Sequence, residues 1–409
     1  MTTKPFKPSK RFIALMACLT GLTALGIDAV LPIFPEMISY YQLPVAEHNR
    51  IQQVVFAYML GFSLFQLFFG ILADTFGRKP LLLFGIGVYL LAAASVVFLR
   101  DFEHVLWARF IQGAGLAAPR VLTMTVVRDV SSGRAMSRIM SFITMIFLII
   151  PAVAPMIGQL IVLVAPWQAV FVLLAVLGAV LLCWVQRDLT ETLAPENRRT
   201  LSFGQIGRAI AEFLSSRFSW VYLLMISMTF GGLMMYIGMA EQILQKDVYQ
   251  LGAYFPFAFA TIVLGMASAS ITNARLVMRL GLHSMLRIGL IIMVISDAVF
   301  LLATLQGDGF IPLGLFLLLF VTRFFGFGLM MPNLNTLAIA DYHHLAGTAS
   351  ALIGMITSVT GVLLAQAVSS FFDGTLFVIS YGFMACSVVL VMAFVYLNYL
   401  NYSTKSAGS

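Results

Sequence analysis

Five charged side chains interrupt long stretches of apolar residues, and these are the residues whose chemistry most needs an explanation. They are Asp28, Arg109, Arg120, Asp297 and Arg323. A charged group in the middle of a lipid bilayer costs about 3 kcal/mol on insertion scales, so it normally faces a partner or a cavity. We therefore expect these side chains either to carry function or to neutralise one another.

Asp28 is the strongest candidate for proton chemistry, because it stands alone about two thirds of the way along the apolar run 12–34. Burial favours a protonated carboxylate, whereas a nearby arginine favours the ionised form. A site that gains and loses its cationic partner can therefore take up and release a proton. We expect Asp28 and Arg109 to lie at similar depth. A structural hydrogen bond to Asp28 is the alternative.

The arginines and Asp297 allow more than one interpretation. Arg120 follows Arg109 by eleven residues, or three helical turns, so both side chains share one helix face roughly 16 Å apart. Arg109 could instead reach the nearby interface with its long side chain. Asp297 and Arg323 are best explained as a buried ion pair, and the alternative is that they bind substrate or a proton. Extra intramembrane arginines favour neutral or anionic compounds.

Two further motifs combine glycine with proline or charge. The loop motif consists of Gly70, Asp74, Gly77, Arg78 and Lys79 in GILADTFGRKP. Its glycines permit a tight turn, and its aspartate can accept from a helix N-terminus or pair with an arginine. The alternative is a loop that only orients the chain by its positive charge.

The second motif lies in the apolar run 138–163. It consists of Pro151, Ala154, Pro155 and Gly158 in IIPAVAPMIGQ. Proline and glycine bend a helix and let it pack closely against a neighbour. A plain kink for packing is the alternative to a functional role.

The elements that position these residues are apolar helices. Of the 409 residues, 61% are hydrophobic and only 10% are charged, a composition that indicates an all-α membrane protein. Runs long enough to span a bilayer number twelve: 12–34, 51–72, 80–99, 104–127, 138–163, 168–186, 218–240, 250–273, 284–305, 310–334, 346–369 and 374–399. We interpret the first run as a retained helix rather than a signal peptide, because it is too long and lacks a cleavage site.

The distribution of lysine and arginine predicts the orientation. With both termini in the cytoplasm, 18 of the 24 basic residues fall on the cytoplasmic side and three on the outer side. Orientation therefore explains the net charge of +7 better than a nucleic-acid partner does. The chain divides into an N-terminal bundle 1–186, a cytoplasmic linker 187–217 and a C-terminal bundle 218–409. Within the linker, 203–213 has the spacing of an interfacial amphipathic helix, or is an ordinary connector.

The motifs together resemble those of the major facilitator superfamily. The loop motif fits its signature G-x-x-x-D-x-x-G-R-[KR], and LWARFIQGAG, with Arg109 and Gln112, looks like its R-x-x-Q-G-x-G. The 151–158 segment is similar to the A-P-x-x-G-G of antiporter-type exporters, with Gln159 in place of the second glycine. Three further features resemble the Bcr/CflA drug-resistance transporters. They are the segment GIDAVLPIFP, the spacing of Tyr58, Gly61, Gln66 and Gly70, and Asp341 followed by HHLAGTASAL.

This resemblance implies two six-helix bundles and proton-coupled efflux of small, largely apolar antibiotics, such as chloramphenicol-like or bicyclomycin-like compounds. It implies that Arg109 takes part in proton coupling and that the loop motif is a conformational latch. It also implies a monomer in the bacterial cytoplasmic membrane, with drugs and protons as its ligands and no cofactor or metal. Possible cavity residues are Tyr58, Phe62, Gln112, Arg120, Met235, Tyr236, Asp297 and Arg323.

Other functions are less well supported by the sequence. A proton-coupled importer of a small nutrient or metabolite is the alternative within transporters. A membrane enzyme or receptor would need clustered histidine, cysteine or paired carboxylates at one depth, which the sequence does not contain. The chain also has no G-x-x-x-x-G-K-[ST] loop, so we do not expect it to use ATP.

Overall fold

A computed structural model describes residues 9–131, 133–194, 196, 198, 203–340, 342 and 346–407, and this part of the chain is helical apart from its turns and loops. Its contacts divide the chain into two compact units. Unit 1 comprises 1–45 and 53–202, and unit 2 comprises 46–52 and 203–409. The division falls inside the expected linker 187–217, part of which lies outside the described residues.

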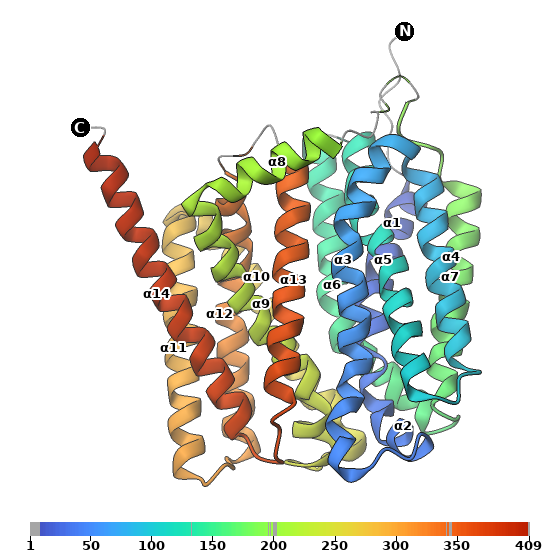
Figure 1. Ribbon diagram of the computed structural model, residues 1–409, viewed down its shortest axis with the longest axis vertical. Helices are drawn as coiled ribbons and strands as arrows, with labels where there is room; N and C mark the ends of the chain where they lie inside the picture. The colour runs from blue at the N-terminus through green and yellow to red at the C-terminus, as the bar shows by residue number, and fades with distance from the viewer. Residues whose placement is uncertain are drawn as a thin grey trace. The chain divides into compact units, whose positions relative to one another are not determined.

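The helices follow one another with short connections (Figure 1). Unit 1 contains α1 (Lys10–Asp28), η1 (Leu31–Ile33), α2 (Phe34–Tyr40), α3 (Gln53–Phe76), α4 (Arg78–Val96), α5 (Phe102–Val130), α6 (Gly133–Val162) and α7 (Gln168–Asp188). Unit 2 contains η2 (Val45–Gln52) from residue 46 onward, α8 (Phe203–Ser215), α9 (Arg217–Ala240), η4 (Glu241–Lys246), η5 (Gly252–Tyr254), α10 (Phe255–Leu280), α11 (Leu282–Gln306), α12 (Leu313–Ile339), α13 (Ala346–Ser369) and α14 (Phe377–Ala407).

Eleven helical stretches of the described residues are long and apolar enough to cross a membrane. They are Lys10–Tyr40, Glu47–Phe76, Arg78–Val96, Phe102–Val130, Gln168–Asp188, Arg217–Lys246, Gly252–Leu280, Leu282–Gln306, Leu313–Ile339, Thr348–Ser369 and Phe377–Leu400. The expected fifth span, 138–163, coincides with part of α6, in which Ile149–Val162 is a shorter apolar helix. The chain is thus a multi-span helical membrane protein, and the number twelve stays a prediction.

The same pattern of helix packing occurs in both units. In unit 1, α3 and α4 pack against α5, α4 packs against α7, and α1 packs against α6. In unit 2, α10 and α11 pack against α12, α11 packs against α14, and α9 packs against α13. The long helices of unit 1, which are α1, α3, α4, α5, α6 and α7, therefore each have a counterpart in unit 2. The internal repetition that the loop sequences indicate only weakly is clear at the level of packing.

The first apolar run is not one continuous helix, contrary to the expectation for 12–34. The helix α1 ends at Asp28, a short 3₁₀ turn with Pro32 follows, and α2 then begins at Phe34. Proline lacks a backbone N–H and clashes with the preceding turn, which accounts for the break at this place. The break sets Asp28 at a helix C-terminus inside the span.

A short segment of the N-terminal half belongs to unit 2 by its contacts. The amide nitrogen of Asn49 donates to the carbonyl of Phe372 at 2.9 Å, and Gln242 donates to the amide oxygen of Asn49 at 2.6 Å. Gln52 also donates to Gln242. These bonds tie η2 to η4 and to the loop before α14.

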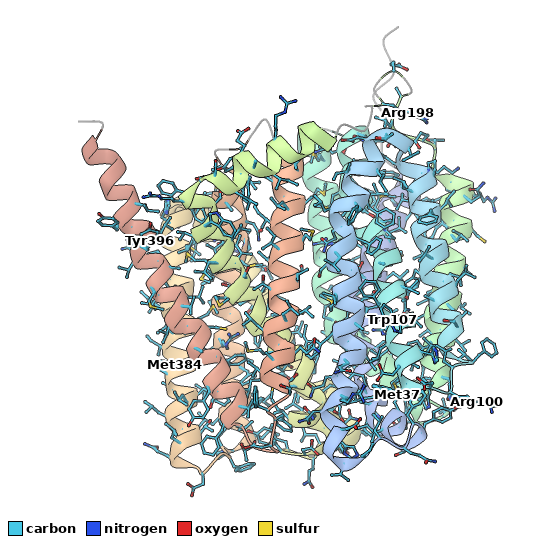
Figure 2. The ribbon with its side chains drawn as sticks, in the orientation of Figure 1. Met37, Arg100, Trp107, Arg198, Met384 and Tyr396 are labelled. Atoms are coloured by element: carbon cyan, nitrogen blue, oxygen red, sulfur yellow. The ribbon has the colours of Figure 1, made fainter. Side chains whose placement is uncertain are left out.

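The loops of unit 1 alternate between the two ends of its helices. Arg100, which follows α4, and Arg198, which follows α7, lie at opposite ends of this unit (Figure 2). The expected topology requires such a separation. The side of the membrane on which each end lies, and hence the cytoplasmic placement of both termini, stays a prediction.

The helix α8 forms where the linker contains the amphipathic pattern. It spans Phe203–Ser215, and it packs against α9 and α13 within unit 2. The helix expected over 203–213 is therefore present. Its place at the membrane interface is not tested by these contacts.

Candidate functional site

Asp28 is buried at the end of α1. Its side chain is 3% exposed, and its oxygen Oδ1 has no hydrogen-bond partner among the described residues. The C-terminal end of a helix carries partial negative charge, which disfavours an ionised carboxylate placed there. An ionised carboxylate in a dry interior is also costly without a cation beside it. Asp28 is therefore a buried carboxylate at a helix end, and its presence inside a span requires an explanation.

Arg109 is fully buried on α5, and all three of its side-chain nitrogens are used. Nε donates to the carbonyl of Val54 at 3.0 Å, Nη2 to that of Gly26 at 2.9 Å, and Nη1 to Oε1 of Gln112 at 2.7 Å. Its guanidinium carbon lies 4.3 Å from the centroid of the Tyr58 ring. With 0% exposure the side chain is enclosed by protein and does not extend to the surface of the molecule.

Asp28 belongs to the last turn of α1, and Arg109 binds a carbonyl of the same turn, but the two side chains do not form an ion pair. Arg109 binds the carbonyl of Gly26, two residues before Asp28, and the ion pairs between described residues include neither side chain. Tyr58 lies beside them, with its hydroxyl 3.4 Å from the carbonyl of Thr23. The structure thus brings Asp28, Tyr58, Arg109 and Gln112 into one buried group, which we call the N-terminal polar cluster.

The proline and glycine motif of α6 contacts the break below Asp28. A Cβ atom at Gly158 would lie 2.1 Å from the carbonyl oxygen of Ala29, so only glycine lets the two backbones approach this closely. Ala154, one turn earlier, is completely buried. Pro151 and Pro155 both lie inside α6. The motif therefore packs against the residue that directly follows the candidate proton carrier.

The loop motif folds around Arg78, which is 4% exposed. Gly77 has φ +98°, a conformation that favours glycine, and it joins the end of α3 to the start of α4. Arg78 pairs with Asp74 at 2.9 Å and with Asp129 at 3.0 Å, and it also donates to the carbonyl of Ala73. The expected pairing of Asp74 with an arginine is therefore confirmed.

Glu191, rather than Asp74, serves the N-terminus of α4. Its carboxylate accepts from the backbone N–H groups of Arg78 at 3.0 Å and Lys79 at 3.1 Å, and from those of Thr192 and Leu193 at 2.9 Å each. Partial burial alone would raise the pKa of Glu191, but these four donors hold it below its ordinary value. Sequence reasoning identified neither Glu191 nor Asp129, because each lies more than fifty residues from Arg78 in the chain.

The Lys79 side chain completes the contacts of the loop motif. Its Nζ donates to the carbonyl of Gln186 at 2.8 Å, near the end of α7. Gly70 lies six residues before the end of α3. All these contacts lie within unit 1, so the motif joins α3, α4, α5 and the segment after α7.

Asp297 and Arg323 form the buried ion pair that their positions predict. Arg323 on α12 donates through Nε to Oδ1 of Asp297 on α11 at 2.8 Å, and both side chains are almost fully buried. Ser387 on α14 donates to the other carboxylate oxygen at 2.7 Å. The pair thus links three helices of unit 2 around one carboxylate.

Aromatic residues surround this pair. Tyr236 on α9 stacks on Phe259 at 5.3 Å between ring centroids and lies 5.1 Å from Phe324. Met235, the neighbouring candidate, is 1% exposed. Among the candidates of unit 1, Phe62 is also buried, whereas Arg120, directly after Pro119 on α5, is half-buried.

The candidate cavity residues do not border either of the two hollows described for unit 1. Hollows of about 550 and 460 Å³ lie on unit 1, and neither is lined by any of the eight candidates. Residues Pro35 and Trp167 border the first and Leu83 and Leu182 the second. Asp341, quoted in the C-terminal motif, lies outside the described residues.

Comparison with known proteins identifies one family. Residues 16–365 match the model of the Major Facilitator Superfamily. The chain is 30% identical over 395 residues to the bicyclomycin resistance protein homolog of Haemophilus influenzae, covering 96% of this chain and 98% of that protein. It is 26% identical to the multidrug resistance protein MdtL of Klebsiella pneumoniae, covering 84% of this chain and 85% of that protein.

The fold is similar to that of solved transporters. The xylose transporter XylE of E. coli, in a partially occluded inward-open conformation, superimposes with a TM-score of 0.71 and covers 95% of this chain and 97% of its own. Its sequence identity is only 12%, so this likeness shows the fold alone.

Proposed function

Because the chain belongs to the major facilitator superfamily and resembles its drug-resistance members, we propose that it exports small, largely apolar antibiotics in exchange for protons. Chloramphenicol-like and bicyclomycin-like compounds are the first substrates to test. The exporter would be a monomer in the bacterial cytoplasmic membrane, with twelve spans and both termini in the cytoplasm. Transport would proceed by alternating access.

The observation that carries the proton coupling is the isolated carboxylate of Asp28. It is buried at the end of a helix, Oδ1 has no hydrogen-bond partner among the described residues, and none of their ion pairs includes it. Intramembrane carboxylates of this kind are functional by default, because a purely structural role would not repay the cost of inserting one. Asp28 would hold a proton in this conformation and release it when water or a cation reaches it.

The coupling step follows from competition for conformations. Protonation of Asp28 would stabilise a packing that buries the carboxylate, as this one does, whereas ionisation would favour a conformation that hydrates it. A drug bound in the opened cavity would stabilise that second conformation. Proton and drug would then drive the transporter in opposite directions, as antiport requires.

Arg109 would act by holding the turn that carries Asp28. Its bond to the carbonyl of Gly26 fixes α1 two residues before the carboxylate, and its bond to Val54 fixes α3. A rearrangement of α1 that frees one of these carbonyls would leave the guanidinium able to pair with Asp28. The proposed role in coupling therefore depends on movement of the break after Asp28.

The motifs of α6 and of the loop would support this movement. The close contact between Gly158 and Ala29 gives α6 direct contact with the break. The loop motif, tied to Asp129 and Glu191, would keep α3, α4, α5 and the segment after α7 together as one body during the transition. We propose that it acts in this way as part of a conformational latch.

The test compares the intact chain with Asp28→Asn in a bacterium that lacks its own drug exporters. Antibiotic susceptibility and drug accumulation would be measured with and without a protonophore. We expect the intact chain to lower accumulation only while the proton gradient lasts, and Asp28→Asn to abolish that effect. Asp308→Asn is the matched control, because Asp308 is exposed and its φ of +50° is also accessible to asparagine.

The possible outcomes separate the alternatives. Accumulation that is unchanged for every compound, or that rises with the intact chain, would contradict export and favour the importer. Export that persists in Asp28→Asn and still collapses with the protonophore would keep proton coupling but remove Asp28 from it.

A further inference from the structure

The ion pair of unit 2 uses only one edge of the Arg323 guanidinium. Nε is bound to Asp297, whose second oxygen accepts from Ser387, so the charge is balanced on that side. The terminal nitrogens Nη1 and Nη2 are buried and make no hydrogen bond with any described residue. Unpaired buried donors are expensive, so two on one side chain require an explanation.

Aromatic packing fixes the plane in which these two nitrogens lie. The guanidinium carbon is 3.6 Å from the centroid of the Phe383 ring and 5.2 Å from that of Phe324. Stacking of this kind, together with the bond to Asp297, immobilises the guanidinium. The free edge is therefore held in position before any partner binds.

The free edge points toward a glycine of α9. A Cβ atom at Gly232 would lie 2.2 Å from Nη2, so the space beside the guanidinium exists only because this residue has no side chain. The preceding residue, Gly231, is also a glycine and packs closely against Leu364 of α13. Paired glycines are a common place for a helix to bend. Bending of α9 here would uncover both nitrogens.

Comparison of the two units shows that this arrangement is not a general requirement of the fold. Gly115 of α5 contacts Gly85 of α4, and the corresponding crossing in unit 2 joins Gly326 to Gly289. Gln112 lies three residues before Gly115 in unit 1, and Arg323 lies three residues before Gly326 in unit 2, so the two side chains occupy corresponding positions. At this position, α5 of unit 1 therefore has a neutral amide, whereas its counterpart α12 of unit 2 has a charged guanidinium.

Arg109 shows how a structural arginine is satisfied in this chain, since each of its three nitrogens has an oxygen partner. Arg323 differs in having a fork of two donors left over. A guanidinium fork matches two coplanar oxygens, such as those of a carboxylate.

From these observations we propose that Nη1 and Nη2 of Arg323 bind the planar two-oxygen group of an aromatic substrate, with a carboxylate preferred over a cationic head. This proposal rests on the export function above and specifies the substrate class of its C-terminal half. Asp297 and Ser387 position the guanidinium, and Phe383 and Tyr236 provide aromatic surface near it. The site is closed here and opens when α9 moves away at Gly232.

The test measures binding to the purified full chain in detergent by fluorescence anisotropy. The probes are fluorescein and rhodamine 123, which share a xanthene body, the first being anionic and the second cationic. We expect the intact chain to bind fluorescein more tightly. Replacing both charges, as Asp297→Asn with Arg323→Gln, should weaken fluorescein binding about tenfold or more and leave rhodamine 123 binding unweakened. The double replacement avoids an unpaired buried carboxylate.

Two further variants separate binding from folding. Arg323→Lys keeps the charge beside Asp297 but removes the fork, so it should also weaken fluorescein binding. Gly232→Ala should do the same by filling the space beside Nη2. Gly314→Ala is its control, because a Cβ atom there meets nothing within 4 Å.

The results distinguish failure of this proposal from failure of export. Equal loss of both dyes in the double variant, or fluorescein binding that survives in Arg323→Lys and Gly232→Ala, would overturn the site while leaving export intact. Fluorescein binding that depends on Arg323, without proton-driven drug uptake into inverted vesicles, would instead retain the site and reject export.

Discussion

Removal of the Glu191 carboxylate should loosen the contacts of the loop motif in unit 1 by an amount that can be worked out from its bonds. In Glu191→Ala, four backbone N–H groups lose their carboxylate acceptor. Two belong to Arg78 and Lys79 at the start of α4, and two belong to Thr192 and Leu193, which follow Glu191. Loss of a side chain that caps a helix N-terminus costs about 1 kcal/mol, with a range of roughly 0.5–2. The charge adds a further interaction with the helix dipole of about 0.3–1 kcal/mol.

The expected cost of Glu191→Ala is therefore at most about 2 kcal/mol, the upper end of the sum of these terms, because solvent reaches the half-buried carboxylate and weakens the contribution of its charge. Glu191→Gln keeps one oxygen acceptor and should lose roughly half as much. In a unit of about 200 residues, about 2 kcal/mol corresponds to a fall of roughly 4–8 °C in melting temperature.

Thermal unfolding of the purified full chain, followed by tryptophan fluorescence, measures this change. Trp107, Trp167 and Trp184 lie in unit 1, and Trp220 lies in unit 2, so the signal reports mainly on the unit that contains Glu191. Glu196→Gln is the control, because Glu196 is an exposed carboxylate of the same connector. Its melting temperature should equal that of the intact chain.

The pH dependence provides a second check. The bound N–H groups hold the pKa of Glu191 below its ordinary value of 4.5. A lowered pKa means that the stabilisation is fully present above 4.5 and is lost as the pH falls through the lowered value. The gap in melting temperature between the intact chain and Glu191→Gln should therefore narrow in acid. An unchanged melting temperature in Glu191→Ala, or a gap that widens in acid, would refute this account of the loop.

Two further predictions concern the N-terminal polar cluster and its contact with α6. Arg109→Lys should destabilise unit 1 by roughly 3 kcal/mol, because one ammonium cannot reach three oxygens on separate elements, and melting measurements of the purified chain should show it. A variant that melts like the intact chain would contradict the role given to these bonds. Gly158→Ala should cost about 1–3 kcal/mol, because its Cβ meets the backbone oxygen of Ala29, whereas Gly87→Ala, with open space around it, should cost nothing in the same assay. An equal change in melting temperature for the two alanine variants would contradict this expectation, because it would show that α6 can move away from Ala29 at little cost.

The sequence was most informative where a single physical cost dominates. Mid-span charges without partners are expensive, so the pairing of Asp297 with Arg323 could be predicted before their distance was known. The apolar runs likewise predicted most spans, because length and hydropathy alone decide whether a helix can cross a bilayer. An arginine was one of the two partners expected for Asp74, and Arg78 provides it across the turn at Gly77, between the end of α3 and the start of α4.

The remaining features depend on tertiary geometry. The partners of Arg109 are two backbone carbonyls and a neighbouring amide, and no residue type in the sequence signals a free carbonyl. Glu191 reaches the start of α4 from more than a hundred residues away, and an acidic residue in a connector is normally a solvated one. The break after Asp28 did have a visible signal in Pro32, which the long apolar run outweighed.

The way in which Arg109 is held has a consequence for genetics. Two of its three acceptors are main-chain oxygens, of Gly26 and Val54, and every amino acid supplies such an oxygen. Random mutagenesis that selects for loss of resistance should therefore recover changes of Arg109 itself, yet few changes that delete an acceptor on α1 or α3. In such a screen Arg109 would look like a solitary essential residue, although three separate oxygens hold it in place.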